Sequence, residues 1–243
     1  MYYTKKYDDQ LLDIGSYDEY NGFYHYFPQM LPWIGKDYAT NTYKRIILIG
    51  ESHYLPKDVD IELLDPNIWY NENHEDYYDK NSDEEEYTNT RKIVNLGKWS
   101  SNAHSIYREP ESILRNIVQK ENTGIECDNF FQFVSYYNYF LRPASKGESI
   151  RATLSEQDER IAKDTFNELV CILKPDFVYF LSKLSFETYK RNSSNENHQF
   201  IVDYSPHPCC SWWNRKKYLY DGEILTGKEK FRNFLIYNKV FDK

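Results

Sequence analysis

Four short runs of β-branched and aromatic residues constrain the fold of this chain more than any other feature. They are RIILIG (residues 45–50), FFQFVSYY (130–137), DFVYFLS (176–182) and QFIVDY (199–204). Each run has the length of a strand and is nearly continuous in apolar residues, the pattern of strands buried on both faces of a parallel sheet. We therefore predict a central four-stranded parallel sheet.

Amphipathic helical segments alternate with these runs. Residues 111–121 and 155–175 place apolar side chains three and four positions apart, and the second segment opens with the capping pattern Ser-x-x-Asp. A last helix is predicted to begin at Thr226, three residues before Glu229, and to run toward Val240. This alternation predicts an α/β fold with a three-layer α/β/α arrangement, in which helices cover both faces of the sheet.

No linker rich in Pro, Gly or Ser and no internal repeat divides the 243 residues, so we predict a single α/β domain over residues 1–243. An acidic segment at residues 58–90, in which Lys80 is the only base, is predicted to be a long insertion after the first strand. The formal net charge of -8 argues against nucleic acid as a default partner, but much of the acid lies in this segment.

The cysteine and hydropathy patterns bear on the compartment. Four cysteines occur without a C-x-x-C pair, which favours reduced thiols in a cytoplasm over disulfides or a cysteine metal site. The N-terminal residues lack the apolar core of a signal peptide, and no apolar run approaches the ~20 residues that span a bilayer. We expect a cytoplasmic protein with no membrane partner and no cofactor.

Ligands of an open parallel sheet bind beyond the carboxyl ends of its strands. Three polar and aromatic segments follow predicted strands in this sequence: GESHY (50–54), YYNYFLRP (136–143) and YSPHPCCSWWNR (204–215). We expect these three segments to share one binding site.

The segment GESHY concentrates chemically capable residues. Gly50 allows a sharp turn and a close approach of the backbone to a ligand, and Ser52 adds a hydroxyl. Glu51 is a candidate general base, His53 a base or metal ligand, and Tyr54 a ring that walls off a pocket. The plainer alternative is a turn whose polar side chains satisfy exposed amides. A metal site that combines these residues with the later histidine is disfavoured, because no close-spaced pair such as H-E-x-x-H is present.

The two later segments add donors, rings and a cation. Prolines on both sides of His207 restrict the backbone and hold the imidazole in one direction, as a donor beside developing charge requires. Trp212 and Trp213 could stack on a base or pack in the core. Asn138 has an amide that can read the edge of a heterocycle or cap the strand, and Arg142 can hold an anion.

Basic residues near these segments are candidates for contacts with nucleic-acid phosphates. They are Arg142, Lys146, Arg151, Arg215, Lys216 and Lys217. The Arg-Lys-Lys run adjoins the tryptophan pair, so a local basic rim can coexist with an acidic chain.

These segments, in this order, resemble the uracil-DNA glycosylase superfamily. RIILIGESHY is similar to the first motif of the family, an apolar strand followed by G-Q-D-P-Y or G-E-x-P-G, and VSYYNYFLRP to its second strand with an Asn and a following Arg-Pro. LKPDFVYFLS resembles a further family strand, and SPHPCCSWWNR the final H-P-S segment. The resemblance implies a four-stranded parallel sheet between helices and a flipped-out base bound at the strand ends.

The resemblance also implies roles for individual residues. Tyr54 would narrow the pocket beside a pyrimidine ring, Asn138 would read the edge of the ring, and His207 would donate to a ring oxygen as negative charge builds on the departing base. Tyr137 rather than Asn138 falls at the family spacing from Arg-Pro, so the reading position is open between them. No cysteine precedes Cys127, which argues against the branch that carries an iron–sulfur cluster.

Three positions depart from the family motifs. Ser52 stands where G-Q-D-P-Y has the aspartate that orients the attacking water, His53 replaces the motif proline, and Cys209 replaces the serine of H-P-S. Glu51 matches the glutamate of the G-E-x-P-G branches, so a carboxylate remains in the motif.

Three functional hypotheses follow. The first is a glycosylase-like enzyme that extrudes a damaged base from DNA and hydrolyses its N-glycosidic bond. The second is a non-catalytic relative that binds a nucleobase, a nucleotide or a protein partner in the same pocket. The third is a hydrolase of an unrelated substrate that uses Glu51 and His53.

Overall fold

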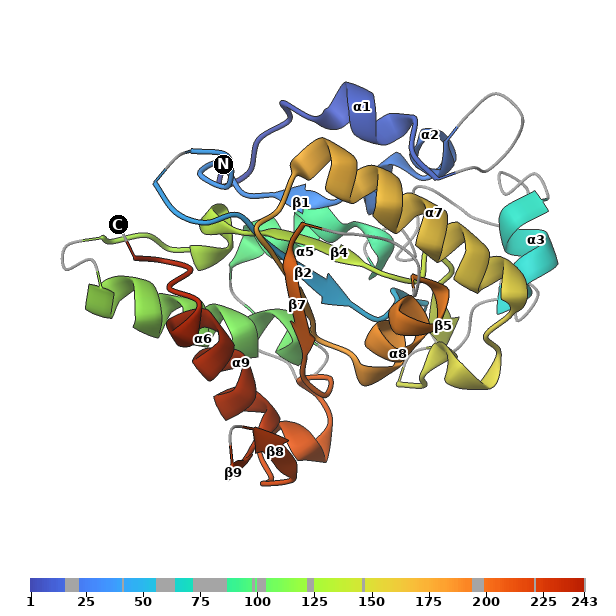
Figure 1. Ribbon diagram of the computed structural model, residues 1–243. Coiled ribbons are helices and arrows are strands. Elements are labelled where there is room, and N and C mark those ends of the chain that lie inside the picture. Colours follow the sequence, from blue (N-terminus) through green and yellow to red (C-terminus); the bar gives the residue numbers. More distant parts are fainter. Residues whose placement is uncertain are drawn as a thin grey trace.

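The chain adopts an α/β fold in which helices pack on both faces of a central sheet (Figure 1). The computed structural model describes residues 1–15, 22–40, 42–55, 64–71, 87–97, 99, 104–121, 125–145, 147–193, 199–220 and 222–242. Of the acidic segment predicted as an insertion, only residues 64–71 and 87–90 lie within these ranges.

The sheet is mixed and has five strands in the order β1-β4-β2-β6-β7. The strands are β1 (Trp33–Ile34), β2 (Ile46–Gly50), β4 (Ser135–Asn138), β6 (Phe177–Phe180) and β7 (Ile201–Tyr204). Strands β4, β2, β6 and β7 are parallel to their neighbours, whereas β1 pairs antiparallel with β4. The prediction of a purely parallel four-stranded sheet therefore missed an edge strand, because two residues are too few to show a periodicity.

Alternate residues of each central strand enter different cores. In β2, Ile47 and Ile49 pack in the core beneath α7 (Glu156–Leu173) and α8 (Lys183–Asn192). Their neighbours Leu48 and Ile46 pack in the opposite core with the helices α6 (Ser105–Glu121) and α9 (Gly227–Tyr237). A strand buried on both faces has no polar side to alternate with, which explains its continuous apolar run.

Side-chain caps set two helix starts at the predicted positions. Both α7 and α9 begin with a capping box, formed by Ser155 with Asp158 and by Thr226 with Glu229. Helix α6 begins six residues before the predicted start at 111 and contains Pro110 in its interior. A proline removes only one helical hydrogen bond, so packing of the apolar face can retain the turn before it.

Part of the second predicted strand is helical instead. Residues Phe130–Phe133 form the 3-10 helix η5, which begins where the Asn129 side chain accepts a hydrogen bond from the Phe131 N–H, and the strand starts only at Ser135. Apolar runs of this length do not distinguish the two conformations by sequence.

Shorter elements complete the described structure. They are α1 (Asp8–Leu12), α2 (Phe23–Tyr26), η1 (Pro28–Met30), β3 (Tyr54–Leu55), α3 (Pro66–Asn71), α5 (Thr90–Leu96), β5 (Ala144–Ser145), η6 (Ile150–Ala152), η7 (Ser211–Trp213), β8 (Tyr218–Tyr220) and β9 (Glu223–Leu225). Strand β3 pairs parallel with β5, and β8 pairs antiparallel with β9.

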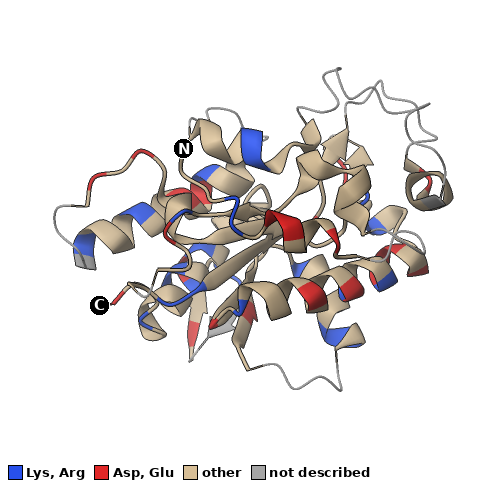
Figure 2. Cartoon of the chain, turned by 90° about the horizontal axis from the view of Figure 1, so that it is seen from above, with Lys and Arg blue, Asp and Glu red and all other residues tan. Residues whose placement is uncertain are grey.

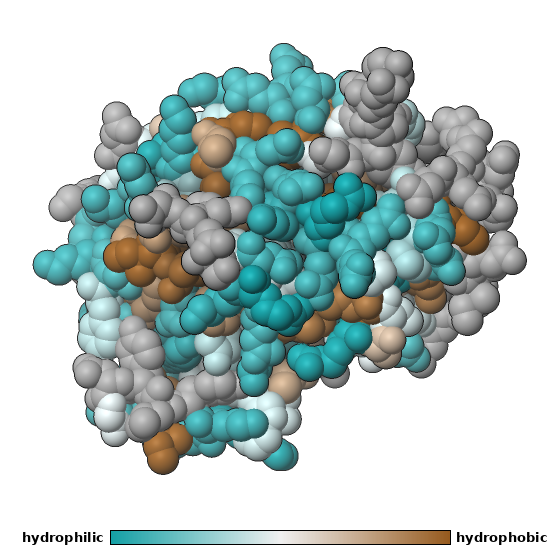
Figure 3. All heavy atoms as spheres, turned by 45° about the vertical axis from the view of Figure 1, so that its right-hand side comes forward, coloured by the Kyte–Doolittle hydropathy of each residue, from teal (hydrophilic) through white to brown (hydrophobic). Residues whose placement is uncertain are grey.

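The surface is polar and its charges are mixed. Lys and Arg residues lie among Asp and Glu residues over the helices rather than on one face (Figure 2). The face seen in Figure 3 is mostly hydrophilic, with apolar residues in small separate patches. Within the described ranges, no helix is long and apolar enough to cross a membrane.

Candidate functional site

A pocket of about 290 Å³ lies where the carboxyl ends of three parallel strands meet. Glu51 follows β2, Ser182 follows β6, and His207 follows β7. The other lining residues are Ser149, Arg151, Lys183, Leu184, Pro206, Cys210, Trp212 and Lys217. The strand-end rule thus predicted Glu51, His207 and Trp212 in one cavity, and Lys217 of the Arg-Lys-Lys run also lines it.

Two serine hydroxyls hold the Glu51 carboxylate. Ser149 Oγ donates to Oε1 at 2.6 Å, and Ser182 Oγ donates to Oε2 at 2.7 Å. Ser182 is also the N-cap of α8, where its hydroxyl accepts from the Ser185 N–H, so the carboxylate lies at the positive end of a helix. Each carboxylate oxygen has a second lone pair, so Glu51 can still accept a hydrogen bond from a ligand or a water molecule.

The backbone determines the tautomer of His207. The Cys209 N–H donates to Nδ1 at 3.2 Å, so Nδ1 must accept and the ring proton is on Nε2. Burial lowers the pKa of His207, and the negative charge of Glu51 opposes this effect. The half-buried ring lies between buried prolines, Pro206 and Pro208. His207 is therefore a neutral, held donor.

Gly50 makes room for side chains of the neighbouring strand. It is the last residue of β2 and pairs in register with Asn138. A Cβ at Gly50 would lie 2.2 Å from Asn138 Oδ1 and 2.3 Å from the hydroxyl oxygen of Tyr136. The predicted sharp turn for ligand approach is therefore wrong: the glycine permits close packing of two strands.

Tyr136 determines how the Asn138 amide is oriented. Its hydroxyl donates to Asn138 Oδ1 at 2.9 Å, which leaves the NH₂ group as the part that can face a ligand. Asn138 is 5% exposed, and this NH₂ group has no hydrogen-bond partner among the residues described. Tyr137, the alternative reading residue, is in the opposite core.

Tyr54 belongs to a cluster of tyrosines beside the pocket. Burial raises the pKa of Tyr54, and Glu51 and Cys209 contribute in the same direction. The rings of Tyr107 and Tyr136 meet edge to face at 5.1 Å, and their hydroxyls are hydrogen-bonded. The strand ends that were expected to converge are therefore close together, although Tyr54 and Asn138 do not line the pocket itself.

His53 and Ser52 point into the protein instead. His53 is 4% exposed, its Nε2 lies 3.2 Å from Thr90 Oγ1, and burial lowers its pKa to about 4. The backbone is held there because the Ala144 N–H donates to the His53 carbonyl. Ser52 is buried, and its hydroxyl has no hydrogen-bond partner in the described part of the chain. The structure therefore does not support a catalytic role for His53.

The alternative metal site does not form. Because His53 is turned away, Glu51 and His207 have no third ligand, and no group of three His, Cys, Asp or Glu side chains within the described ranges is placed to hold a metal ion. Two ligands are fewer than the three or four protein ligands of a zinc site.

Two further predicted contacts are in the interior. Arg142 is fully buried and donates to both oxygens of Asp158 and to the Thr153 carbonyl, so its guanidinium cannot reach a phosphate. Trp213 is also fully buried, and its Nε1 donates to Glu109 at 3.4 Å, so it packs rather than stacks on a ligand. Local sequence does not distinguish a buried arginine from an exposed one, because its partner is distant in the chain.

The pocket is more basic than the chain as a whole. Among the described lining residues, Arg151, Lys183 and Lys217 are cations and Glu51 is the only carboxylate. Arg215 and the adjacent Lys216 are exposed immediately before Lys217 in the chain, and Lys146 lies outside the described residues.

Sequence reasoning missed Ser149, Ser182 and Lys183 as residues of the pocket, and it assigned no role to Tyr136 within the predicted segment 136–143. The rule that found the other lining residues would also have found Ser182 and Lys183, since they follow the third predicted strand. Ser149 had no comparable signal, because its role depends on Glu51, which is 98 residues away in the chain.

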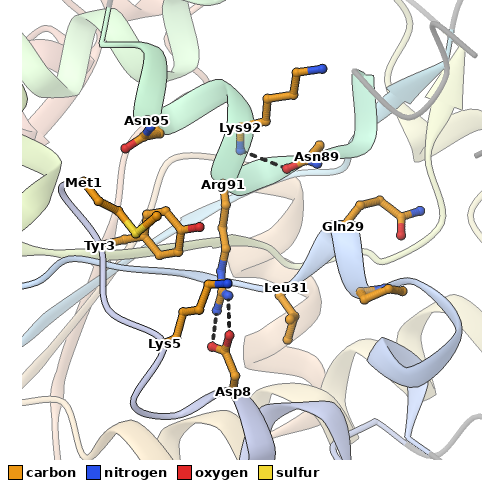
Figure 4. A pocket seen from close by; sticks show the side chains of 11 residues that line it. Met1, Tyr3, Lys5, Asp8, Gln29, Leu31, Asn89, Arg91, Lys92 and Asn95 are labelled. Carbon is orange, nitrogen blue, oxygen red and sulfur yellow. Dashed lines mark hydrogen bonds and ion pairs between the residues drawn. The ribbon is translucent and has the colours of Figure 1, made fainter. Parts of the chain in front are cut away.

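A second hollow, of about 370 Å³, lies between the N-terminal residues and α5 (Figure 4). Its central cation, Arg91, donates to both carboxylate oxygens of Asp8 and to the Pro32 carbonyl. Since this charge is already paired, and no predicted site residue lies here, we assign no ligand to it.

No protein-family model matches this chain, and no curated protein matches it. The resemblance to uracil-DNA glycosylases therefore rests on the quoted segments, and function is inferred from the chemistry of the pocket.

Proposed function

We propose that the chain is a divergent uracil-DNA glycosylase-like enzyme that binds an extruded base at this pocket and hydrolyses its N-glycosidic bond. One observation carries the proposal: a held carboxylate, Glu51, and a neutral imidazole donor, His207, share a pocket at the carboxyl ends of parallel strands. Glycosidic hydrolysis requires one group that stabilises the departing base and another that orients and activates the attacking water.

His207 would act on the departing base. When the bond between C1′ and the base nitrogen breaks, its electron pair stays with the base, and negative charge develops on a carbonyl oxygen of the base. The Nε2–H of a neutral imidazole can donate to that oxygen, and a donor that is already oriented loses little energy in reorganising. The hydrogen bond from the Cys209 N–H holds the proton on the required nitrogen.

Glu51 would act on water. A carboxylate that accepts a hydrogen bond from a water molecule can orient it toward C1′ and take its proton as the C–O bond forms. The two serine hydroxyls fix the carboxylate and leave lone pairs for this purpose. Glu51 would then perform the task of the motif aspartate, whose position Ser52 occupies.

Asn138, which does not line the pocket but pairs in register with Gly50 next to Glu51, would supply recognition. Its NH₂ group can donate to a ring carbonyl oxygen but cannot accept from an exocyclic amino group while Tyr136 holds the amide oxygen. This arrangement favours a uracil-like edge over a cytosine-like edge. Tyr54 lies near Glu51 and can limit the space beside the ring.

The test is release of free uracil from an oligonucleotide that contains one uracil. We expect release by the natural chain and a loss of about 10²–10³-fold in rate for His207→Ala, the usual effect of removing one donor to developing charge. Glu51→Gln should cost about 10²–10⁴-fold, as for loss of a general base. His25→Ala and Glu126→Gln, which do not line the pocket, are matched controls. Equal rates for His207→Ala and the natural chain would contradict the proposal.

The departure at Ser52 favours one alternative, a protein that binds a base without hydrolysing its bond. That function predicts salt-dependent binding of the same oligonucleotide, weakened by His207→Ala, with no free base released by the natural chain.

A further inference from the structure

We infer that the DNA reaches this pocket as a single strand, with a base next to the target stacked on Trp212 and nearby phosphates on Lys217, Arg151 and Lys183. This inference rests on the proposed function and narrows its substrate class. Three observations support it: the exposure of Trp212, the position of Lys217 beside its ring, and the small extent of the basic rim formed by Arg151, Lys183 and Lys217.

The two adjacent tryptophans differ in exposure: Trp213 is buried, and Trp212 is exposed at the pocket. Trp213 is fully buried in the core with Phe231 and holds η7 in place. Trp212 is 37% exposed and lines the pocket. The other four of the five tryptophans are at most 6% exposed; they are Trp33, Trp69, Trp99 and Trp213. An indole displayed at the edge of a polar cavity offers a ring face on which a base can stack.

A cation accompanies this ring. Lys217 Nζ lies 4.1 Å from the centroid of the Trp212 ring, and the Lys217 N–H donates to the Leu225 carbonyl, which fixes the backbone beside the pocket. Each nucleotide of a strand carries two groups that match these side chains: a flat base that can stack on the indole and a phosphate that can contact the ammonium. Base stacking on an aromatic side chain beside a basic groove is how single strands are bound without sequence selection.

The basic rim is too small to bind an extended duplex. Among the described residues, three cations line the pocket, of which Lys183 is paired with Glu187 at 3.2 Å, and Arg215 and Lys216 extend the rim by two. The rest of the surface has mixed charges, and the chain has a formal net charge of -8 (Figure 2). A duplex places phosphates of both strands beyond the rim, over the mixed charges of the remaining surface, whereas a single strand can pass over the rim alone.

Stacking itself selects the single strand. In a duplex, both faces of each base are covered by neighbouring base pairs, so an indole has no face to contact. In a single strand the base beside the target is unpaired and can turn toward Trp212, and the target base is extruded at a lower cost.

Tryptophan fluorescence during titration with an all-thymine oligonucleotide tests the inference without a target base. We expect quenching by the single strand and at least about tenfold weaker binding of the same oligonucleotide paired to its complement. Trp212→Ala should remove the quenching and weaken single-strand binding by about 10–100-fold, whereas Tyr237→Ala, an exposed aromatic change on α9, should do neither. Lys217→Ala should reduce the slope of log affinity against log salt by about one, and Lys120→Ala should leave the slope unchanged.

The outcomes separate this inference from the proposed function. Quenching by the single strand without release of uracil from any substrate supports the inference and contradicts hydrolysis. Release of uracil combined with equal single-strand and duplex affinities, or with unchanged binding in Trp212→Ala, overturns the inference and leaves hydrolysis intact.

Discussion

His53 was predicted to be catalytic, and its buried position makes a different and quantitative prediction for stability. Burial lowers its pKa from 6.5 to about 4, and its Nε2 contacts Thr90 Oγ1 at the start of α5. In the unfolded chain the imidazole takes up a proton at its usual pKa, whereas in the folded chain it stays neutral to lower pH. Acid therefore favours the unfolded state.

The size of this effect follows from the two pKa values. The stability associated with neutral His53 is complete above pH 6.5, falls as the pH drops toward 4, and changes no further below that. At about 1.4 kcal/mol per pH unit, the expected loss is about 2 kcal/mol at pH 5 and about 3 kcal/mol at pH 4. Such a loss is a large fraction of the stability of an ordinary domain.

Urea unfolding of the natural chain and of His53→Gln at pH 7 and pH 5 measures this loss. Glutamine can retain a hydrogen bond to Thr90 but does not titrate, so the drop in free energy of unfolding between the two pH values should be about 2 kcal/mol smaller in the variant. Lys120→Gln, an exposed change at the end of α6, should keep the full drop. Base release at pH 7 should survive in His53→Gln. Equal drops in the variant and the natural chain would refute the assignment of His53 as a buried neutral group.

Three further substitutions test the neighbouring structure. Tyr136→Phe should reduce the free energy of unfolding by about 1 kcal/mol and free the Asn138 amide to turn. The ratio of uracil release to cytosine release should then fall by about tenfold. An unchanged ratio would show that Tyr136 does not orient the amide. Gly50→Ala should destabilise the chain by about 1–3 kcal/mol in urea unfolding, because the added methyl overlaps the Tyr136 and Asn138 oxygens. Combining it with Tyr136→Phe should cost less free energy of unfolding than the sum of the two single changes. Simple additivity of the two costs would contradict the overlap. Arg142→Met should lower the free energy of unfolding by about 3–5 kcal/mol, because it leaves Asp158 buried without its partner. The affinity of the folded variant for the oligonucleotide should stay within about twofold of that of the natural chain. A large loss of affinity would indicate that Arg142 contacts a phosphate after all.

Features that depend on near neighbours in the chain could be predicted from the sequence. The apolar runs of β2, β6 and β7 and the capping pairs that open α7 and α9 are local patterns, and each was located to within a few residues. The position of Glu51 and His207 in one cavity also followed, because parallel strands bring their carboxyl ends to one edge of a sheet.

The direction of each side chain depended on partners that are distant in the sequence. Arg142 is buried because Asp158 lies opposite it, and Gly50 is needed because side chains of the neighbouring strand occupy the space of a Cβ. His53 is turned inward toward Thr90, which is 37 residues away in the chain. Short-range periodicity and capping therefore determined the elements and the end of the sheet where the site lies. Only the tertiary structure decided which polar side chains face the pocket, because burial and hydrogen bonding between distant segments outweigh the preferences of a local motif.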